Sequence, residues 1–113
     1  MLIGDLAAAT GASARSLRYY EEHGLIGSQR SANGYRDYAA EVVPQVRFIR
    51  SLISAGFSLQ AIESILPCMA AEPAQIDLCP SVVQVIRETL CDVEAQVDAL
   101  SAKREKIEAL LAG

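Results

Sequence analysis

Residues 13–24 read Ser-Ala-Arg-Ser-Leu-Arg-Tyr-Tyr-Glu-Glu-His-Gly, and they predict the central helix of the fold. Ser13 offers a hydroxyl N-cap and Gly24 suits a helix end, so a helix is predicted from about residue 14 to about residue 23. Successive side chains on a helix are separated by about 100°, which here divides a basic face from an apolar one. The basic face carries Arg15, Arg18, Tyr19 and Glu22, and the apolar face carries Leu17 and Tyr20.

A second short helix is predicted just before this one. Apolar residues recur at helical spacing between residues 3 and 7, and Gly11 suits a left-handed C-terminal cap. Two short helices joined by a tight turn that contains glycine predict a helix-turn-helix over residues 1–24. In this motif the second helix enters the DNA major groove, where guanidinium groups pair with guanine edges or phosphates. We expect Glu22 to orient Arg18 through an i, i+4 pair.

Residues 28–38 predict a β-hairpin. Asn33-Gly34 lies between two short extended runs and is the strongest local signal for a two-residue turn. A hairpin after a helix-turn-helix forms a wing that lies along the DNA backbone and reaches the minor groove. Its candidate contacts are Arg30, Tyr35 and Arg36. The alternative is a solvent-exposed hairpin without a partner.

The net charge of −4 argues against a nucleic-acid binder until it is divided along the chain. Residues 1–57 carry six Arg and five acidic residues, whereas residues 58–113 carry four basic and nine acidic residues. All four tyrosines lie between positions 19 and 38, interleaved with arginines. Tyrosine and arginine in one short stretch favour a surface that contacts phosphates and sugars. The alternative is that the tyrosines belong to the core.

Two further helices are predicted over residues 40–67, with Gly56 between them and Ser58 as the cap of the second. This pair is expected to close the small core of a DNA-binding region that spans residues 1–69. As an alternative role, Arg47 and Arg50 supply a second basic wing.

Residues 80–112 predict one long dimerisation helix, which follows a linker loop over residues 70–79. Apolar side chains at strict 3,4 spacing run along this helix, and Arg104 is the one polar position in the series. The apolar positions are Val83, Ile86, Leu90, Val93, Val97, Leu100, Ile107 and Leu111. A helix of about 33 residues is about 50 Å long and cannot fold back on a core of this size. The narrow stripe is typical of a coiled-coil seam, so we expect a homodimer.

Several motifs occur in a fixed order along the chain. They are Ile3-Gly4-Asp5-Leu6-Ala7, Thr10-Gly11, Leu17-Arg18-Tyr19-Tyr20-Glu21, Gly24-Leu25-Ile26, Asn33-Gly34-Tyr35-Arg36-Asp37-Tyr38 and Gly56-Phe57-Ser58-Leu59. Together they resemble the MerR family of bacterial transcription regulators. The match spans nearly the full chain, and its most specific part is Arg-Tyr-Tyr-Glu followed by Asn-Gly-Tyr-Arg at this separation.

The resemblance implies a mainly α fold, in which a winged helix-turn-helix DNA-binding domain is followed by a long antiparallel coiled-coil dimerisation helix. It also implies a homodimer on a pseudo-palindromic operator in double-stranded promoter DNA. Distortion of that DNA lets RNA polymerase, an indirect partner, engage both promoter elements. The candidate DNA-binding residues are Ser13, Arg15, Arg18, Tyr19, Tyr20, Arg30, Tyr35 and Arg36. Of these, Tyr20 is also turned toward the core by helical geometry.

The effector of such a regulator is less well defined by the sequence. Metal-sensing relatives hold ions with cysteines after the dimer helix and drug-sensing relatives carry a further domain there, whereas we expect a short form without a C-terminal effector domain. Cys79 matches a helix-start cysteine of several metal-sensing relatives, and a helix N-terminus favours its thiolate. Cys79 and Cys68 are therefore candidate ligands of a thiophilic metal or targets of an oxidant, with no cofactor required for DNA binding. Packing is the alternative role, and the one favoured for Cys91.

Other classes of function are less well supported. The sequence shows no catalytic set, glycine-rich phosphate loop or four-ligand zinc spacing, so an enzyme is not expected. The alternatives to a regulator are an architectural or recombination-accessory DNA-binding protein and a coiled-coil interaction protein that acts without an effector.

No apolar run reaches the ~18 residues that a membrane span requires. The three cysteines lie at no regular spacing and fit free thiols, so a cytoplasmic protein is expected.

Overall fold

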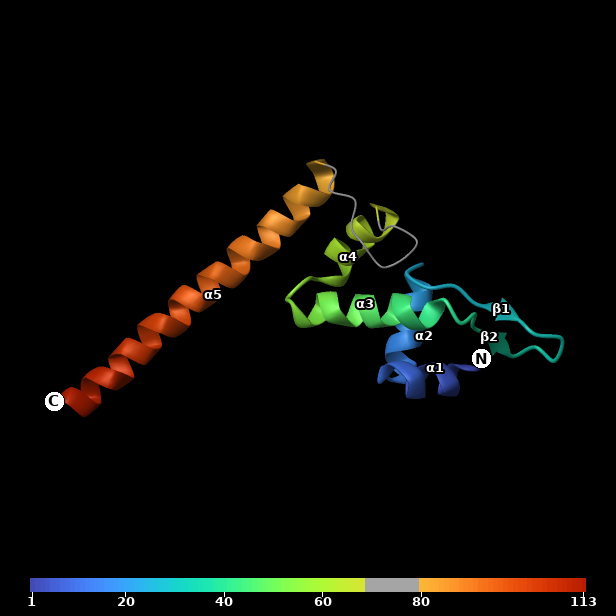
Figure 1. The fold of residues 1–113 in the computed structure, drawn as a ribbon, viewed down its shortest axis with the longest axis horizontal. Coiled ribbons are helices and arrows are strands. Elements are labelled where there is room, and N and C mark those ends of the chain that lie inside the picture. Colours follow the sequence, from blue (N-terminus) through green and yellow to red (C-terminus); the bar gives the residue numbers. More distant parts are fainter. Residues whose placement is uncertain (69–79) are drawn as a thin grey trace. The chain divides into compact units, whose positions relative to one another are not determined.

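The fold of this chain is mainly α-helical, as expected. A computed structural model describes residues 1–68 and 80–113. The chain divides into two compact units, Met1–Asp77 and Leu78–Gly113, and each is described by itself. The elements of the first unit are α1 (Ile3–Thr10), α2 (Ala14–Glu22), β1 (Gln29–Arg30), β2 (Arg36–Asp37), α3 (Val42–Ser54), α4 (Leu59–Ile65) and the 3₁₀ helix η1 (Leu66–Cys68). The second unit holds the long helix α5 (Pro80–Ala112) (Figure 1).

The helix-turn-helix forms where its capping residues predict it. Gly11 follows α1 in the left-handed region, at φ 75°, and its backbone N–H donates a 2.8 Å hydrogen bond to the Ala7 carbonyl. The Ser13 hydroxyl oxygen accepts a 3.1 Å hydrogen bond from the Ser16 N–H at the start of α2. Because each helix end is capped by its own residue, a short turn is enough to join α1 to α2.

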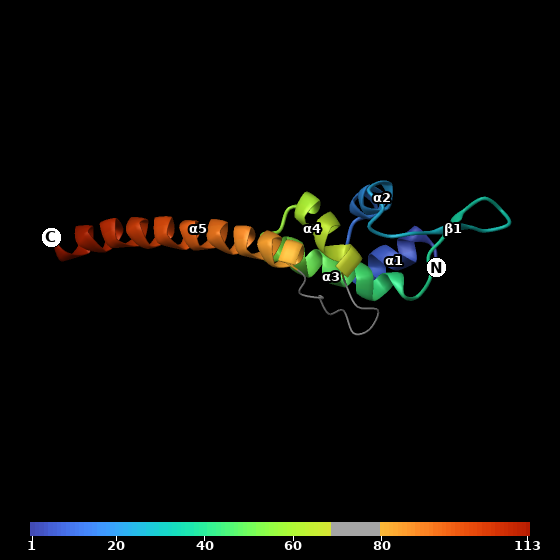
Figure 2. The ribbon, with the colours of Figure 1, turned by 90° about the horizontal axis from the view of Figure 1, so that it is seen from above.

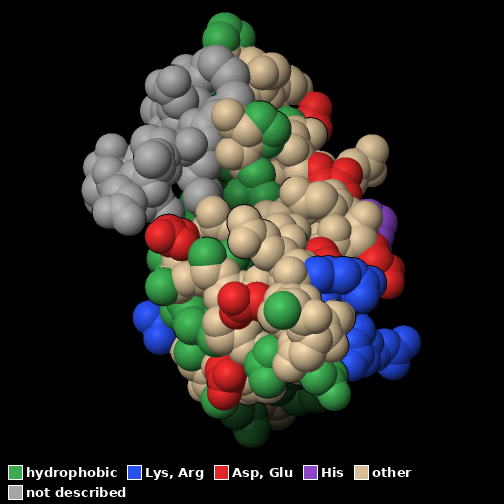
Figure 3. Space-filling model, turned by 90° about the vertical axis from the view of Figure 1, so that its right-hand side faces the viewer, with side chains coloured by type: hydrophobic (Ala, Val, Ile, Leu, Met, Phe, Trp, Pro, Cys, Tyr) green, Lys and Arg blue, Asp and Glu red, His purple; other side chains and the backbone are tan. Residues whose placement is uncertain are grey.

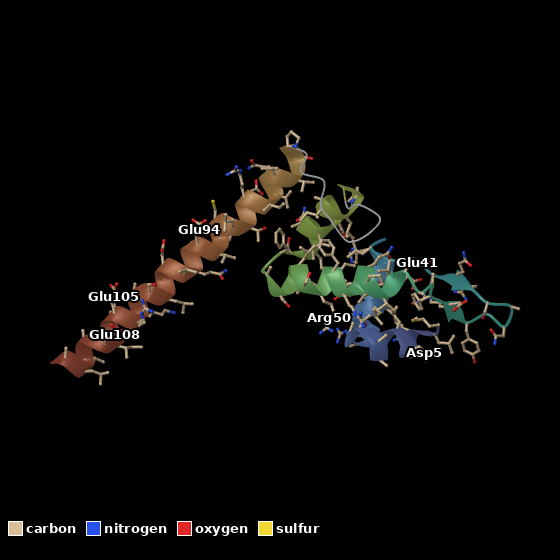
Figure 4. All side chains as sticks on the ribbon, in the orientation of Figure 1. Asp5, Glu41, Arg50, Glu94, Glu105 and Glu108 are labelled. Carbon is tan, nitrogen blue, oxygen red and sulfur yellow. The ribbon has the colours of Figure 1, made fainter. Side chains whose placement is uncertain are left out.

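Two arginines of α3 bind the C-terminal end of α1. Arg50 Nη1 donates a 2.5 Å hydrogen bond to the Thr10 carbonyl, and Arg47 Nη2 donates one of 2.9 Å to the Ala9 carbonyl. The last carbonyls of a helix have no partner within the helix, so these bonds satisfy them and fix α3 to α1. Figure 4 shows Arg50 extending from α3 on the side of α1. The sequence did not indicate this structural role.

The wing is the β1–β2 hairpin, and its turn differs from the predicted one. The register pairs Gln29 with Asp37 and Arg30 with Arg36. The Gly34 N–H donates to the Ser31 carbonyl, so the tight turn is centred on residues 32 and 33. A two-residue Asn-Gly turn needs positive φ at both residues, yet among the described residues only glycines have one, Gly34 at 86°. The prediction of a two-residue turn was therefore wrong, because Gly34 serves as the left-handed third residue of a longer loop.

The core of the first unit is formed by α1–α4 and the end of the wing. Its most deeply buried side chains are Leu6, Leu17, Tyr38, Val46, Ile49, Ile62 and Ile65. Tyr20 is also buried, at 6% exposure, because it lies three residues after Leu17 on the inner face of α2. The core alternative is thus correct for Tyr20, and its expected contact with the DNA backbone is not supported. Figures 1 and 2 both show the wing projecting away from the four helices.

The helix α5 has the bounds that its apolar pattern predicts. Its stripe is largely uncovered, since the side chains of Leu90, Val97, Leu100, Ile107 and Leu111 are between 53% and 86% exposed. A contiguous apolar surface of this kind on a helix is typical of an interface. In the described ranges, 1–68 and 80–113, no helix combines the length and apolar character needed to cross a membrane.

Candidate nucleic-acid interface

The outer face of α2 is exposed and basic, as its pattern predicts. Arg15 and Arg18 lie at the surface and line a groove of about 650 Å³, whose other lining residues include Ile53 and Leu59. The groove therefore runs between α2 and the corner that joins α3 to α4. Glu22 also lines it, but among the residues that the structure describes no ion pair joins Glu22 to Arg18. The expected i, i+4 pair is not formed.

A second groove, of about 540 Å³, lies between α2, the wing and the start of α1. Three arginines line it, Arg18 from α2, Arg30 from β1 and Arg36 from β2. The one acidic lining residue is Asp5, and its Oδ2 already accepts a 3.1 Å hydrogen bond from the Leu2 N–H. Figure 3 shows Lys and Arg side chains at both edges of the face that carries the wing, with most of them at one edge. The arginine groove, as we call it, is thus positively charged and suited to an anion.

Glu21 connects α2 to the base of the wing. Its Oε1 accepts a 2.6 Å hydrogen bond from the Tyr38 hydroxyl, and its Oε2 accepts one of 3.0 Å from the Ser28 hydroxyl. Arg36 Nε lies 3.5 Å from the same Oε2. Ser28 precedes β1 and Tyr38 follows β2, so one carboxylate holds both ends of the hairpin against the helix. The position of the wing beside α2 is thereby set within the protein.

The surroundings of Glu21 favour its charged form. Partial burial alone raises the pKa of Glu21, but two hydroxyl donors and the guanidinium group of Arg36 outweigh it and hold this pKa below the ordinary value. Burial and the adjacent Glu21 carboxylate raise the pKa of the Tyr38 hydroxyl above its ordinary value. At neutral pH the pair is therefore a carboxylate that accepts and a neutral hydroxyl that donates.

The C-terminal end of α2 is held by α4. His23 Nδ1 lies 3.3 Å from Oε1 of Glu63, and the His23 ring centroid lies 4.1 Å from that of Tyr19. Tyr19 is exposed on the basic face, and the His23 ring at the C-terminal end of α2 packs against the Tyr19 ring. His23 thus has a structural role in positioning Tyr19.

The predicted contact residues do not all lie together. Arg18, Arg30, Tyr35 and Arg36 line the arginine groove, and Arg15 and Tyr19 line the neighbouring groove. Ser13 caps α2. Tyr20 is in the core, where it also forms part of the lining of the neighbouring groove. The sequence pattern did not predict that Glu21 holds the wing against α2. The available signal was a carboxylate inside a basic, tyrosine-rich stretch, at the border between the apolar and basic faces of α2.

Of the three cysteines, Cys91 is a free and exposed thiol on α5. Cys79 lies outside the described residues, and so does the side chain of Cys68, which ends η1. Within the parts of the chain that the structure describes, no three His, Cys, Asp or Glu side chains come together as a group able to hold a metal ion.

A helix-turn-helix followed by a β-hairpin, with an arginine-lined groove between them, defines the winged helix-turn-helix class of DNA-binding proteins. Residues 1–67 match the family model described as MerR HTH family regulatory protein. The chain belongs to the MerR family of transcriptional regulators.

Known proteins are similar to the chain over nearly its whole length. HmrR, an HTH-type transcriptional regulator of Rhizobium leguminosarum bv. viciae, is 32% identical over 98% of this chain and 84% of its own. A MerR-family regulator from Bacillus cereus has a TM-score of 0.62 and 27% identity, over 99% of this chain and 75% of its own. HiNmlR, a MerR family regulator that lacks the sensor domain and is bound to promoter DNA, shares the fold, with a TM-score of 0.64 and 22% identity. The latter match covers 98% of this chain and 86% of HiNmlR.

Proposed function

We propose that the protein binds a pseudo-palindromic operator in promoter DNA as a homodimer and controls transcription by distorting that DNA. RNA polymerase is an indirect partner, because it engages promoter elements that the distortion realigns. The proposed DNA contacts are Ser13, Arg15, Arg18, Tyr19, Arg30, Tyr35 and Arg36.

The observation that carries this proposal is the arginine groove. Arg18 extends from a helix of the kind that enters the major groove, whereas Arg30 and Arg36 extend from a wing that follows the backbone. A DNA backbone that passes between α2 and the wing would place phosphates against these guanidinium groups. Because phosphate contacts supply much of the affinity for DNA, the groove accounts for binding despite the acidic chain.

The bonds of Glu21 support a preorganised DNA-binding surface. Tyr38, Ser28 and Arg36 fix the wing to α2 in the free protein. Loops that are ordered before binding cost less free energy to immobilise on the ligand. Glu21 is therefore proposed to strengthen DNA binding without touching DNA.

The second copy required for a two-part operator is proposed to pair through α5. Burial of the exposed stripe gives the driving force. Charge gives the direction, because residues 80–98 hold one arginine and four carboxylates, whereas residues 99–112 hold three basic and two acidic residues. Antiparallel pairing places the acidic half against the basic half of the partner, whereas parallel pairing places two acidic halves together. Each chain then brings one winged helix-turn-helix to one half-site.

Distortion of the promoter is proposed because two DNA-binding units that are joined through α5 have to contact both half-sites of one duplex at the same time. Contacts made at both ends offset the elastic cost of bending the duplex. HiNmlR, which has this fold and lacks the sensor domain, is bound to promoter DNA. That structure supports DNA binding by a chain with this fold.

Binding to a duplex from the protein's own upstream region tests this function. We expect affinity to fall steeply with salt and to be lost on a scrambled duplex, together with a change in transcription from that promoter. A salt slope near zero would contradict the proposal and favour a coiled-coil interaction protein. Equal affinity for both duplexes without any effect on transcription would favour an architectural or recombination-accessory protein.

A response to a thiophilic metal or an oxidant is proposed for Cys79 and Cys68, on the basis of the sequence. Transcription from the same promoter is measured with a panel of such metals and oxidants. We expect Cys79→Ser to abolish the response and the control Cys91→Ser to keep it. A response that persists in Cys79→Ser would refute the role of Cys79.

A further inference from the structure

We propose that the two α5 helices pair in one specific register, in which Arg87 of each chain faces Glu108 of the partner. This inference rests on the proposed homodimer and adds the contact that fixes its alignment. Its evidence is the exposed stripe of α5 and the distribution of charge beside that stripe.

The stripe assigns heptad positions along α5. Val83, Leu90, Val97, Arg104 and Leu111 occupy position a, and Ile86, Val93, Leu100 and Ile107 occupy position d. The flanking e positions are Arg87, Glu94, Ser101 and Glu108, and the flanking g positions are Thr89, Gln96, Lys103 and Leu110. In an antiparallel pair an a residue packs beside a d residue of the partner, while e lies beside e and g beside g.

Registers of this pair differ by whole heptads, because only such a slip restores the apolar layers. In each of two registers, eight of the nine stripe residues pack beside a stripe residue of the partner helix. A slip by a further heptad leaves three stripe residues at one end of each helix without such a neighbour. In one of the two, Val97 packs beside the partner's Val93. In the other, Val97 packs beside the partner's Leu100.

The first register is disfavoured by both charge and burial. It places Glu94 beside the partner's Glu94, and two like charges in direct opposition repel each other. It also leaves out Leu111, whose side chain is 86% exposed.

The second register removes both problems. It covers Leu111 and leaves out Val83, which is already partly buried in the single chain. Glu94 now faces Ser101 of the partner, a neutral residue. Arg87 faces the partner's Glu108, and twofold symmetry makes this contact twice.

The side chains at these positions are free to make the contact. Glu108 is 65% exposed, and its Oε1 lies 3.6 Å from Arg104 Nε in the same helix. Arg87 is exposed and has no ion-pair partner among the described residues of its own chain. Figure 4 shows Glu108 near the C-terminal end of α5 and Glu94 closer to its middle. At each end of the pair, Glu108 therefore joins Arg104 of its own chain to Arg87 of the partner.

Two single charge reversals, Arg87→Glu and Glu108→Arg, test the register in the full chain by sedimentation equilibrium. Each reversal turns two attractions into two repulsions. The dissociation constant of each variant homodimer is therefore expected to be about tenfold higher than that of the native homodimer. A mixture of the two variants restores both ion pairs between unlike chains. The dissociation constant of this heterodimer is expected to lie within about threefold of that of the native homodimer.

The matched control uses Glu105→Arg in place of Glu108→Arg. Glu105 is at heptad position b, which faces away from the partner, so the charge change is the same but lies outside the pairing surface. A mixture of Arg87→Glu with Glu105→Arg has the same overall charge and is expected to gain no such recovery. Equal recovery in both mixtures would overturn the register while leaving the dimer in place. A native protein that sediments as a single chain at micromolar concentration would instead refute the proposed dimer itself. Circular dichroism of each variant checks that α5 remains helical.

Discussion

The Tyr38 hydroxyl, at the end of the wing, donates a 2.6 Å hydrogen bond to Oε1 of Glu21 on α2. The Tyr38 ring is buried in the core, so its hydroxyl has a fixed position at the edge of the packed interior. The bond therefore connects three parts of the molecule, the core, the wing and the helix proposed to enter DNA. Because the wing projects from the helices, such an anchor at its base sets where its arginines lie.

Removing this hydroxyl measures the strength of the anchor. Tyr38→Phe keeps the buried ring and leaves one carboxylate oxygen without its donor, so we expect unfolding to be easier by about 1 kcal/mol. DNA affinity is expected to fall as well, because the wing loses its fixed position. Urea unfolding and operator titration give the two values. Tyr35→Phe is the control, since Tyr35 is 64% exposed and should change stability little. Equal effects of the two changes on stability would contradict the role of Tyr38.

The same pair predicts how the anchor depends on pH. The folded pKa of Glu21 lies below its ordinary value of 4.5, so its stabilisation is present above that value and is lost as pH falls through the folded pKa. The folded pKa of Tyr38 lies above its ordinary value of 10.0, so its stabilisation is present below that value and is lost as pH rises through the folded pKa. The stability difference between native protein and Tyr38→Phe should thus be constant from about pH 6 to about pH 9 and shrink outside that window. A difference that grows toward acid or alkaline pH would show that the bond is not the cause.

Arg18 is expected to carry sequence-specific binding. It is exposed on α2 and lines both grooves, so Arg18→Ala removes a guanidinium without disturbing the core. Loss of a base or phosphate contact of this kind costs about 1–3 kcal/mol of binding free energy. Footprinting and titration on the operator measure the loss. Lys106→Ala makes the same charge change on α5 and should keep the footprint, whereas an unchanged footprint in Arg18→Ala would contradict the assignment.

A side chain at Gly11 is expected to destabilise the fold. Its φ is 75°, and a Cβ atom there would lie 2.7 Å from Arg50 Nη1, which holds the end of α1. We expect Gly11→Ala to lower the free energy of unfolding by about 1–2 kcal/mol. Gly4→Ala is the matched control, because Gly4 lies in α1 and has nothing within 4 Å of its added Cβ. Thermal unfolding of the two variants compares them, and a Gly11→Ala protein as stable as Gly4→Ala would refute the argument.

Features encoded by neighbouring residues were predictable from the sequence. The Ser13 cap, the Gly11 stop and the apolar period of residues 80–112 each act within a few residues or along one helix, and the structure has all of them. The hairpin was predicted, but its turn was not, because Asn33-Gly34 is compatible with two loop lengths. The ladder that pairs Arg30 with Arg36 settles the choice in favour of the longer loop.

Features made by residues distant in the sequence were not predictable in the same way. Glu21 meets Tyr38 only after the wing has folded back on α2, and Arg50 meets Thr10 across 40 positions. Helical geometry left both orientations open for Tyr20, and the packing of α2 against the core decides between them. Residue type and period thus predicted where cations gather, whereas tertiary structure determined how they are held.

The proposed function requires two chains that act together on one duplex. Sedimentation velocity of the protein, alone and with an operator duplex over a range of salt, measures this directly. We predict a dimer at micromolar concentration before DNA is added, then two chains per duplex in a complex that dissociates as salt rises. A single chain at those concentrations, or a complex that salt does not weaken, would contradict it.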